Sequence, residues 1–468
     1  YGLPDLNSQM RRVKEIMDSN KKIYARSPGI SYQDLIKLDK VSPPEILTIE
    51  NSYPPGTSSI PTNRYTDKEF HNLEMEKIWT NIWQMACREE EIPNAGDYII
   101  YEIGTYSIII VNTGDEIKAH RNVCRHRGRQ LCDHDGNKPN FTCPYHGFSW
   151  NLDGTIKRIT SQWDFPEIDK SDFNLSSVRC ESWGGWVFIN MNNETDSLLS
   201  FLGELPEHFK IWPPEERYIQ AHVAKIMDCN WKTCQEAFME ALHIMGTHPQ
   251  ALGASGDENS QFDVWGNFAR AITAYGTQSP RLEYELTEQE LFESMLGRAI
   301  DDKTPPGILP EGVSAREYVC QLSRENSEKI IGSDIKISDA EIIDTIYYNL
   351  FPNFHPWGGW GDYSKIVYRF RPLKDRHDKS IMECYFLSPF SGERPPPAAI
   401  KWLDEDEPWT NAPELGVLAK VFQQDSFNLP KVQKGLNNSP FGEIKLSNYQ
   451  ESKIRHWHDL YSTWIKKT

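Results

Sequence analysis

The chain of 468 residues is long enough for two or three domains with a substantial hydrophobic core. Its formal net charge of −17 and isoelectric point near 5.3 argue against nucleic acid or an anionic membrane as the main partner. The nine cysteines lack the spacing of a small disulfide framework, which indicates a reducing compartment. Because no stretch approaches the roughly 18 apolar residues of a membrane span and residues 1–30 lack a signal-peptide pattern, we expect a cytoplasmic protein.

The first 64 residues are predicted to be an extension ahead of the compact part of the chain. Residues 6–25 are expected to form a polar helix without a wide apolar stripe. Residues 42–63 contain five prolines, a composition typical of an extended linker. We expect the extension to pack on the surface of the protein or on a neighbouring subunit, or to form a peripheral arm.

The first compact element is predicted to begin at Thr66. Thr66 and Glu69 have the spacing of a capping box, and apolar residues follow at helical spacing. Short strands are then expected over 98–101, 106–111 and near 183–191, with turn residues between them. This spacing predicts a small antiparallel domain.

Two loops of this small domain carry cysteine and histidine in mixed pairs. Cys124 and His126 form a C-x-H pair, and after sixteen intervening residues Cys143 and His146 form a C-x2-H pair. Two thiolates on one iron and two imidazoles on the other are the ligands of a Rieske-type [2Fe-2S] cluster. Since zinc ligands usually come in pairs of one kind, the mixed pairs favour the cluster over a tetrahedral zinc site.

A second candidate metal site lies in residues 228–250. His243 and His248 are five residues apart, so on a continuous helix they would point about 140° from each other. Gly246 and Pro249 predict that the helix ends between the two histidines, which lets His248 turn back toward His243.

The same stretch carries two glutamates. Glu236, Glu240 and His243 would share one face of a continuous helix. Glu236 is expected to be an ion-paired or solvated helix residue. The alternative is that it tunes proton delivery or binds a cationic substrate.

Two histidines and one carboxylate, with open positions left over, form the facial arrangement of non-heme Fe(II) sites. The candidate carboxylate is Asp425, which follows a helix-like run at 415–422 and lies on its apolar face. A carboxylate there is costly to bury unless it is paired or bound to a metal. By composition, Asp404, Glu405 and Asp362 remain alternatives.

The region between these motifs is expected to carry the substrate-entry elements. It contains a strand-like run at 262–277, capping boxes at 287–290 and 338–341, and a proline- and glycine-rich loop at 305–312 that could act as a lid. Strands at 365–371 and 380–387 predict a larger antiparallel sheet. A group of aromatic residues could line the bottom of an apolar pocket or belong to the core: Phe351, Phe354, His355, Trp357 and Trp360.

Both metal motifs resemble those of the Rieske non-heme iron oxygenases, the family of aromatic-ring-hydroxylating dioxygenase alpha subunits. The cluster segment resembles the family's Rieske domain in Asn122 to Gly128, Cys143 to Gly147 and Trp150. The catalytic half resembles it in Asn230-Trp231-Lys232, Glu240-x-x-His243-x4-His248 and Gln423-Gln424-Asp425. The resemblance covers roughly residues 65–440 and joins two independent metal signatures in the family's order.

The resemblance implies a role for each of these residues. His243, His248 and Asp425 would bind a mononuclear iron, and Glu240 would bridge His243 to the cluster ligand His146 of another subunit. The family usually has aspartate at the bridging position. Glutamate occurs in a minority of members, including oxygenases of trimethylammonium compounds.

The fold expected from the resemblance is α+β, with a small antiparallel Rieske [2Fe-2S] domain and a larger catalytic domain whose antiparallel sheet is covered by helices in a helix-grip-like arrangement. We predict an N-terminal extension and linker at 1–64, the Rieske domain with its leading helix at 65–195 and the catalytic iron domain at 196–468. The resemblance also implies a homotrimer, with or without a small beta subunit, in which one subunit's cluster meets another's iron.

The expected function is that of a terminal oxygenase acting with O2 on a hydrophobic, aromatic substrate, by dihydroxylation or monohydroxylation. Without a nucleotide-binding or ferredoxin motif, it would depend on an external reductase or ferredoxin. Arg125, Arg127 and Arg129 are expected to form a basic collar for that donor or to pair with acids of their own domain. The alternatives are a demethylase or trimethylammonium-type monooxygenase, an electron carrier with a vestigial iron site, and a zinc-stabilised binding module.

Overall fold

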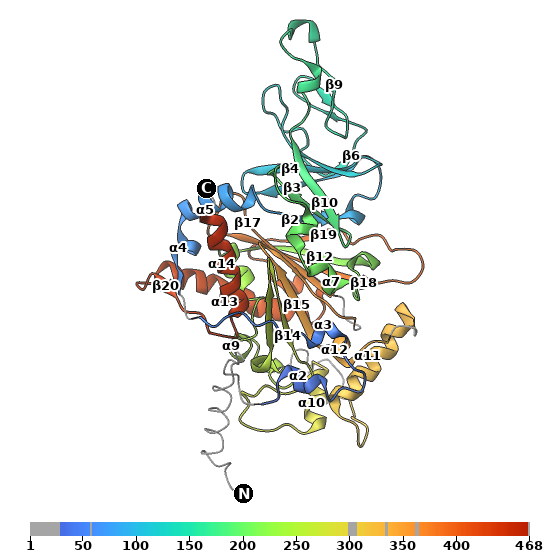
Figure 1. Ribbon diagram of the computed structural model, residues 1–468, viewed down its shortest axis with the longest axis vertical. Helices are drawn as coiled ribbons and strands as arrows, with labels where there is room; N and C mark the ends of the chain where they lie inside the picture. The colour runs from blue at the N-terminus through green and yellow to red at the C-terminus, as the bar shows by residue number, and fades with distance from the viewer. Residues whose placement is uncertain (1–28, 57–58, 298–306, 333–335, 361–364, 467–468) are drawn as a thin grey trace.

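The computed structural model describes residues 29–56, 59–297, 307–332, 336–360 and 365–466. Within them, most strands belong to two small sheets formed by residues 84–190 and one large sheet formed by residues 217–403. Figure 1 shows the small sheets at one end of the long axis and the large sheet in the middle. The helix expected over 6–25 lies outside the described residues.

The small sheets have seven and three strands. The first has the order β2 (Gln84–Arg88), β11 (Trp186–Asn190), β10 (Ser177–Trp183), β5 (Ile117–Arg121), β4 (Tyr106–Asn112), β3 (Asp97–Ile103) and β6 (Gly136–Asn137). The second contains β7 (Phe141–Thr142), β8 (Ser149–Trp150) and β9 (Ile156–Arg158). All neighbouring strands are antiparallel, as expected.

The large sheet has eight strands and is antiparallel except at one edge. Its order is β13 (Gln261–Trp265), β14 (Phe268–Thr273), β15 (Thr345–Leu350), β16 (Phe354–Pro356), β17 (Lys365–Pro372), β18 (Ser380–Pro389), β12 (Arg217–Met227) and β19 (Ile400–Leu403). The parallel pair is β12 and β19. The strand-like run expected over 262–277 is a hairpin, in which Trp265 pairs with Phe268 across a turn at Gly266.

Helices cover one face of the large sheet. Helix α8 (Trp231–Glu236) contacts β17 and β18, and α14 (Ser452–Lys466) contacts β13 and β14. The long helix α13 (Leu418–Asn437) packs on α8 and on α9 (Ile244–Thr247). These four helices supply or support the residues of the second metal motif.

Further helices lie at the opposite end of the molecule from the small sheets (Figure 1). They are α10 (Glu288–Met295), α11 (Ala315–Ile331) and α12 (Asp339–Ile343). The capping boxes expected at the starts of α10 and α12 are both present. The seventeen-residue α11 was not predicted, although its N-cap Ser314 accepts a hydrogen bond from the backbone N–H of Glu317.

The predicted capping box at Thr66 is wrong. The helix α5 (Lys68–Glu74) begins one residue later, with Asp67 as N-cap accepting a hydrogen bond from the backbone N–H of Glu69. Thr66 instead ends the preceding α4 (Asn63–Thr66). A π-helical turn (Met75–Trp79) continues α5, and the short helices α6 (Leu198–Leu202) and α7 (Leu205–Phe209) connect the small sheets to the large one.

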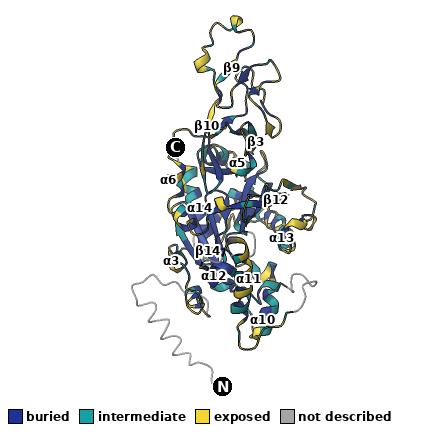
Figure 2. Ribbon diagram, turned by 90° about the vertical axis from the view of Figure 1, so that its right-hand side faces the viewer, coloured by how far each residue is buried: buried dark blue, intermediate teal, exposed yellow. Residues whose placement is uncertain are grey.

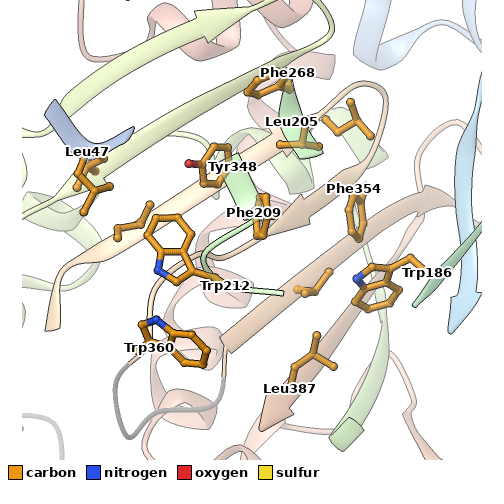
Figure 3. Close-up of a cluster of buried hydrophobic side chains, with 14 of the residues drawn as sticks. Leu47, Trp186, Leu205, Phe209, Trp212, Phe268, Tyr348, Phe354, Trp360 and Leu387 are labelled. Carbon is orange, nitrogen blue, oxygen red and sulfur yellow. The ribbon is translucent and has the colours of Figure 1, made fainter. Parts of the chain in front are cut away.

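The two faces of the large sheet carry different layers of the core, because neighbouring strand residues point to opposite sides. On one face, Trp186 of β11 lies 5.3 Å from both Phe354 and Tyr385, between ring centroids, and fixes the small sheets to the large one (Figure 3). On the other face, Tyr368 and Cys384 belong to the core beneath the covering helices. Figure 2 shows the large sheet as the buried centre and the loops around β9 as largely exposed.

The described part of the N-terminal extension packs on its own chain. It contains α2 (Tyr32–Ile36) and α3 (Glu45–Thr48), whose apolar side chains enter the core that includes Leu47 (Figure 3). Arg270 donates hydrogen bonds to the carbonyl oxygens of Ile46 and Ile49. The β1–β20 pair (Ile60–Pro61 with Glu443–Ile444) ties the segment to the C-terminal region.

A buried ion pair links α5 to α8. Glu74 accepts hydrogen bonds from Lys232, Trp231 and Tyr461, and the side chains of Glu74 and Lys232 are fully buried. Replacing Lys232 with methionine is expected to lower the free energy of unfolding by about 3–5 kcal/mol, because a buried carboxylate loses its cation. Denaturant unfolding followed by circular dichroism measures the loss.

The matched control is Lys210→Met, which removes an exposed lysine paired with Glu207 at 2.8 Å. This change is expected to alter stability by no more than about 0.5 kcal/mol. Equal effects of the two substitutions would contradict the importance assigned to the buried pair.

No helix in the described ranges combines the length and the apolar character needed to cross a bilayer. The cytoplasmic location stays a prediction. The division at residues 64–65 and 195–196 also stays a prediction, and the small and large sheets lie on either side of the second boundary.

Candidate metal centres

The two cysteine- and histidine-bearing loops have the same backbone construction. In the first, Cys124 N–H donates to the Arg129 carbonyl at 2.7 Å, and Gly128 N–H donates back to the Cys124 carbonyl at 2.9 Å. In the second loop the equivalent bonds join Cys143 to Phe148 at 2.8 Å and Gly147 to Cys143 at 3.0 Å. Both glycines have φ of 76°, a left-handed conformation that a side chain would strain.

The two cysteines of these loops lie close together, and so do the two histidines. Cys124 and Cys143 are buried free cysteines, and the rings of His126 and His146 lie 4.6 Å apart between centroids. Among the described residues, the Nδ1 of His126 is buried without a hydrogen-bond partner, although its ring stacks on Phe148 at 4.7 Å between centroids. A buried nitrogen lone pair with nothing to accept is what a metal ligand requires.

The ligand spacing and the surroundings of the sulfur favour two irons over one zinc. Each loop supplies one cysteine and one histidine, whereas zinc sites usually take ligand pairs of one kind. Burial raises the pKa of the Cys124 thiol, while hydrogen bonds from the backbone N–H groups of His126 and Arg127 oppose that rise. Backbone amides aimed at sulfur are typical of iron–sulfur sites.

The three arginines beside the cluster loops differ in their surroundings. Arg129 makes a two-pronged ion pair with Asp133, with distances of 2.7 and 3.0 Å. Arg125 donates to backbone carbonyls and stacks on Phe173. Arg127 is exposed above the Tyr145 ring. Pairing with an acid of the same domain therefore applies to Arg129, whereas Arg125 and Arg127 are both exposed.

The second motif converges on one point. His248 Nε2 lies 2.9 Å and His243 Nε2 lies 3.7 Å from the same oxygen, Oδ1 of Asp425. Among the described residues, these three form the one group of at least three potential metal ligands whose donor atoms all lie within 4.8 Å of each other. Two imidazoles and one carboxylate in this arrangement suit non-heme Fe(II).

Each histidine is oriented by a hydrogen bond at its other nitrogen. His243 Nδ1 donates to Oε1 of Glu240 at 2.7 Å, since an ionised carboxylate can only accept. His248 Nδ1 lies 2.9 Å from Oε1 of Gln424, which also accepts from Gln250 at 2.7 Å. Both Nε2 atoms are thereby left with a free lone pair toward Asp425.

The local backbone around the histidines differs from the predicted helix. Helix α8 ends at Glu236, and Glu240 lies in a turn in which its Oε2 accepts from the backbone N–H of His243 at 3.0 Å. The short α9 runs through Gly246 and ends just before His248, the residue that precedes Pro249. The shared face of a continuous helix was therefore wrong, but the turn between the two histidines was correctly expected.

Asp425 reaches the site from the middle of α13, and not from a helix end. Its buried neighbours Phe422 and Leu429 lie on the same helix face. Of the alternative carboxylates, Glu405 pairs with Lys379 and Asp404 is exposed. Asp362 lies outside the described residues.

Glu236 belongs to a hydrogen-bonded network, and both of its expected roles stay predictions. Its carboxylate accepts from Tyr65 OH at 3.0 and 3.1 Å and from His458 Nε2 at 2.9 Å. Burial lowers the pKa of His458, whose Nδ1 accepts from Arg64 at 2.9 Å. The carboxylate is therefore held in place on the wall of the site.

An open cavity of about 620 Å³ adjoins the metal ligands. Glu236, Glu240, His243 and Asp425 contribute to its wall. Burial opposes protonation of His243, but the hydrogen bond and charge of Glu240 outweigh it and raise the pKa of the ring. Glutamine side chains that orient ligands, such as Gln424, were not predicted.

The aromatic group divides between the two faces of the large sheet. His355 and Trp357 lie on the helix-covered face, where Trp357 contacts Tyr368 at 6.2 Å between centroids. Phe354 and Trp360 belong instead to the core against the small sheets (Figure 3). Phe351 packs against Trp457 of α14. Two of the five residues therefore lie on the metal-site side.

Comparison with known families identifies both halves of the chain. Residues 214–467, more than half of the chain, match the family described as ring hydroxylating alpha subunit (catalytic domain). Residues 82–168 match the Rieske [2Fe-2S] domain.

Curated relatives are similar over part of their length. The large subunit of anthranilate 1,2-dioxygenase from Acinetobacter baylyi is 31% identical over 227 residues, which are 44% of this chain and 48% of the relative. The oxygenase subunit of carnitine monooxygenase from Escherichia coli is 31% identical over 212 residues, covering 44% of this chain and 57% of the relative. The matched segments thus span about half the length of these relatives.

Solved structures share the fold at low sequence identity. A quaternary ammonium Rieske monooxygenase in complex with L-carnitine has a TM-score of 0.62 at 17% identity, covering 88% of this chain and 96% of that one. Naphthalene 1,2-dioxygenase from Rhodococcus sp. has a TM-score of 0.57 at 21% identity, covering 87% and 94%. With the family matches and the two metal-ligand sets, they lead to one assignment: the chain belongs to the Rieske non-heme iron oxygenase family of ring-hydroxylating alpha subunits, whose cofactors are a [2Fe-2S] cluster and a mononuclear iron.

Proposed function

We propose that this chain is the terminal oxygenase component of an electron-fed oxygenase system. It takes electrons from an external reductase or ferredoxin and uses O2 to oxidise an organic substrate. The observation that carries the proposal is the convergence of His243, His248 and Asp425, each histidine held by its own hydrogen bond. An electron carrier that used the cluster alone would have no need for this second set of oriented ligands.

Each group of residues has a proposed role. The cluster ligands are Cys124, His126, Cys143 and His146, and the iron ligands are His243, His248 and Asp425. When bound, the cluster supplies single electrons and the iron supplies O2 activation. Glu240 keeps the His243 proton on Nδ1 and so keeps Nε2 available.

The proposed assembly is a homotrimer, with or without a small beta subunit. The cluster loops lie by β7–β9 at one end of the molecule, far from α9 (Figure 1). We infer that His146 of the partner subunit approaches Glu240 through the open cavity. Exposed apolar side chains suited to such a contact occur both by the cluster and by the cavity: Val123, Tyr145, Trp163, Leu242, Met245, Phe427 and Val432.

The proposed substrate is a hydrophobic, aromatic compound that undergoes monohydroxylation or dihydroxylation. In support, aromatic side chains including Phe238 and Tyr368 line the helix-covered face of the sheet, 4.8 Å apart between centroids. The second candidate is N- or O-demethylation or oxidation of a trimethylammonium compound. It is favoured by the glutamate at position 240 and by similarity to the carnitine monooxygenase subunit.

The test is oxygen incorporation by the full chain loaded with both metal centres. The protein is supplied with a purified reductase and NADH under ¹⁸O2, with benzoate, naphthalene or glycine betaine. We expect ¹⁸O in the product or, for demethylation, substrate-dependent formaldehyde, in step with NADH consumption. Complete reduction of the cluster without O2-dependent product, across a wider substrate panel, would favour the electron-carrier alternative.

Glu240→Gln is expected to slow substrate oxidation by about 10- to 100-fold while metal content and cluster colour are retained. Glutamine keeps an oxygen near His243 but loses the charge that orients the ring and accepts from a partner. Stopped-flow reoxidation of the reduced cluster by O2 with substrate measures the effect. Glu204→Gln, at an exposed position before α7, is the control, and an unchanged reoxidation rate in Glu240→Gln would refute the bridging role.

A further inference from the structure

Lys453 on α14 is fully buried and has no acidic partner among the described residues. Its Nζ lies 4.1 Å from the centroid of the Tyr347 ring and donates one long hydrogen bond, 3.3 Å, to the Tyr347 carbonyl oxygen. An ammonium group has three donors, and burying it without a counter-charge is costly. Burial accordingly holds the pKa of Lys453 well below its usual range. The Lys453 amine therefore lacks a negatively charged partner among the described residues.

Two further buried side chains lack partners in the described part of the chain, one near Lys453 and one on the helix that contacts α14. Both ring nitrogens of His355 and both amide atoms of Gln235 have no hydrogen-bond partner in the described part of the chain. Burial lowers the pKa of His355 well below its usual range, and the nearby Lys453 adds to that shift. Gln235 lies on α8, which contacts α14 through Trp231 and Trp457 and through Glu236 and His458.

These side chains lie at the end of an aromatic row that leads to the proposed iron site. Tyr347 contacts Trp357 at 6.3 Å, and Trp357 contacts Tyr368 at 6.2 Å, between ring centroids. Tyr368 contacts Phe422 at 6.0 Å, three residues before Asp425 on α13. A flat apolar molecule on this row would have one end near the iron ligand and the other near Lys453.

We propose that Lys453, His355 and Gln235 form an anion subsite that binds the carboxylate of an organic acid substrate, whose apolar body lies on the aromatic row. A carboxylate supplies both the missing charge and several acceptor lone pairs. A neutral hydrocarbon would leave all three side chains unsatisfied, and ordered water is the competing occupant. The inference rests on the proposed function and narrows its substrate class to carboxylic acids.

Benzoate and its neutral isostere benzamide test the subsite. Binding to the metal-loaded full chain is measured by calorimetry under anaerobic conditions without reductant. We expect the wild-type protein to bind benzoate at least about tenfold more tightly than benzamide, a difference of about 1.4 kcal/mol. Lys453→Met is expected to remove this preference, because it keeps the length of the side chain and deletes the charge.

Two further variants complete the test. Lys466→Met removes an exposed lysine at the end of the same helix and is expected to leave the preference unchanged. His355→Phe keeps an aromatic ring against Phe370, 5.1 Å away, and is expected to weaken benzoate binding without affecting benzamide. Because Lys453 has no acidic partner among the described residues and makes only one long hydrogen bond, its methionine variant should melt at or above the wild-type temperature, whereas a lysine needed for stability would lower it when replaced.

Several results would overturn the subsite. Equal binding of benzoate and benzamide, or no benzoate binding, would mean that water alone serves these polar groups. A benzoate preference that survives in both Lys453→Met and His355→Phe would place the carboxylate elsewhere, for example on the metal itself. The binding test is independent of oxygen chemistry. If the proposed oxygenase function is wrong, the protein can still bind benzoate selectively. If the anion subsite is wrong, the protein can still incorporate ¹⁸O into other substrates.

Discussion

Replacing Asp425 with alanine is expected to release the mononuclear iron and abolish substrate oxidation while the cluster colour remains. Oδ1 of Asp425 is the atom that both histidine Nε2 atoms face, at 2.9 and 3.7 Å. Without it, two neutral imidazoles remain, and no negative charge holds the divalent ion. Metal analysis should show a fall from about three irons per chain to about two, with acid-labile sulfide unchanged at about two.

Asp406→Ala, on an exposed loop, is the matched control and should retain all iron and full activity. The visible spectrum of both variants should bleach on reduction in the same way as the wild-type spectrum. Turnover retained in Asp425→Ala would refute its assignment as a ligand. Attention would then move to Asp404, Glu405 and Asp362.

Replacing Cys124 with serine is expected to remove the cluster entirely. A hydroxyl at neutral pH is a far poorer ligand for iron than a thiolate, and the loop presents this one sulfur to the cluster. The purified variant should be colourless at visible wavelengths, free of labile sulfide and unable to accept electrons from a reductase. The single iron held by His243, His248 and Asp425 should remain, because its ligands come from separate elements.

Cys132→Ser distinguishes a ligand from a neighbour. Cys132 is buried in the same segment, but its Sγ is 3.6 Å from Lys138 Nζ, a contact that a serine hydroxyl can also make. The brown colour and sulfide content of this variant should match those of the wild type. If Cys132→Ser lost its colour and Cys124→Ser kept it, Cys132 would be the cluster ligand and Cys124 the neighbour. If the wild-type protein contained zinc and no sulfide, the zinc-stabilised binding module would be supported.

The cluster ligands could be predicted because each pair is local in sequence. Cys124 and His126 share one tight loop, as do Cys143 and His146. Residue type and spacing therefore determine how the two ligands of each pair are placed relative to each other. The groups that orient the iron ligands were harder to find. Gln424 meets His248 across 176 residues of sequence, and a glutamine gives no signal of such a role by itself.

The helix around Glu240 was predicted too long because local propensity favoured it. Residues 237–243 include alanine, methionine, glutamate and leucine, all good helix formers, yet α8 ends at Glu236. The carboxylate of Glu240 bonds both the backbone N–H and the ring of His243, which stabilises a turn over a continued helix. At Glu240, side-chain contacts therefore outweighed the helix propensity of the local sequence.

The faces of the large sheet could not be assigned from sequence for a different reason. Strand β17 is buried along its whole length, so it lacks the alternation of apolar and polar residues that reveals a sheet face. Tyr368 and Val367 are equally buried, but the first lies toward the iron ligands and the second toward the small sheets. Only the packed structure separates them, which is why the aromatic group could not be divided between the two faces from sequence.

This two-sided burial limits how the chain can change in evolution. A single-residue insertion in β17 would exchange the two faces of that strand beyond the insertion, turning residues such as Val367 toward the metal ligands or Tyr368 toward the small sheets. Insertions and deletions should therefore be tolerated in connections such as residues 390–399 and excluded from the strands themselves. Divergence toward new substrates would proceed by replacing side chains on a sheet of fixed register.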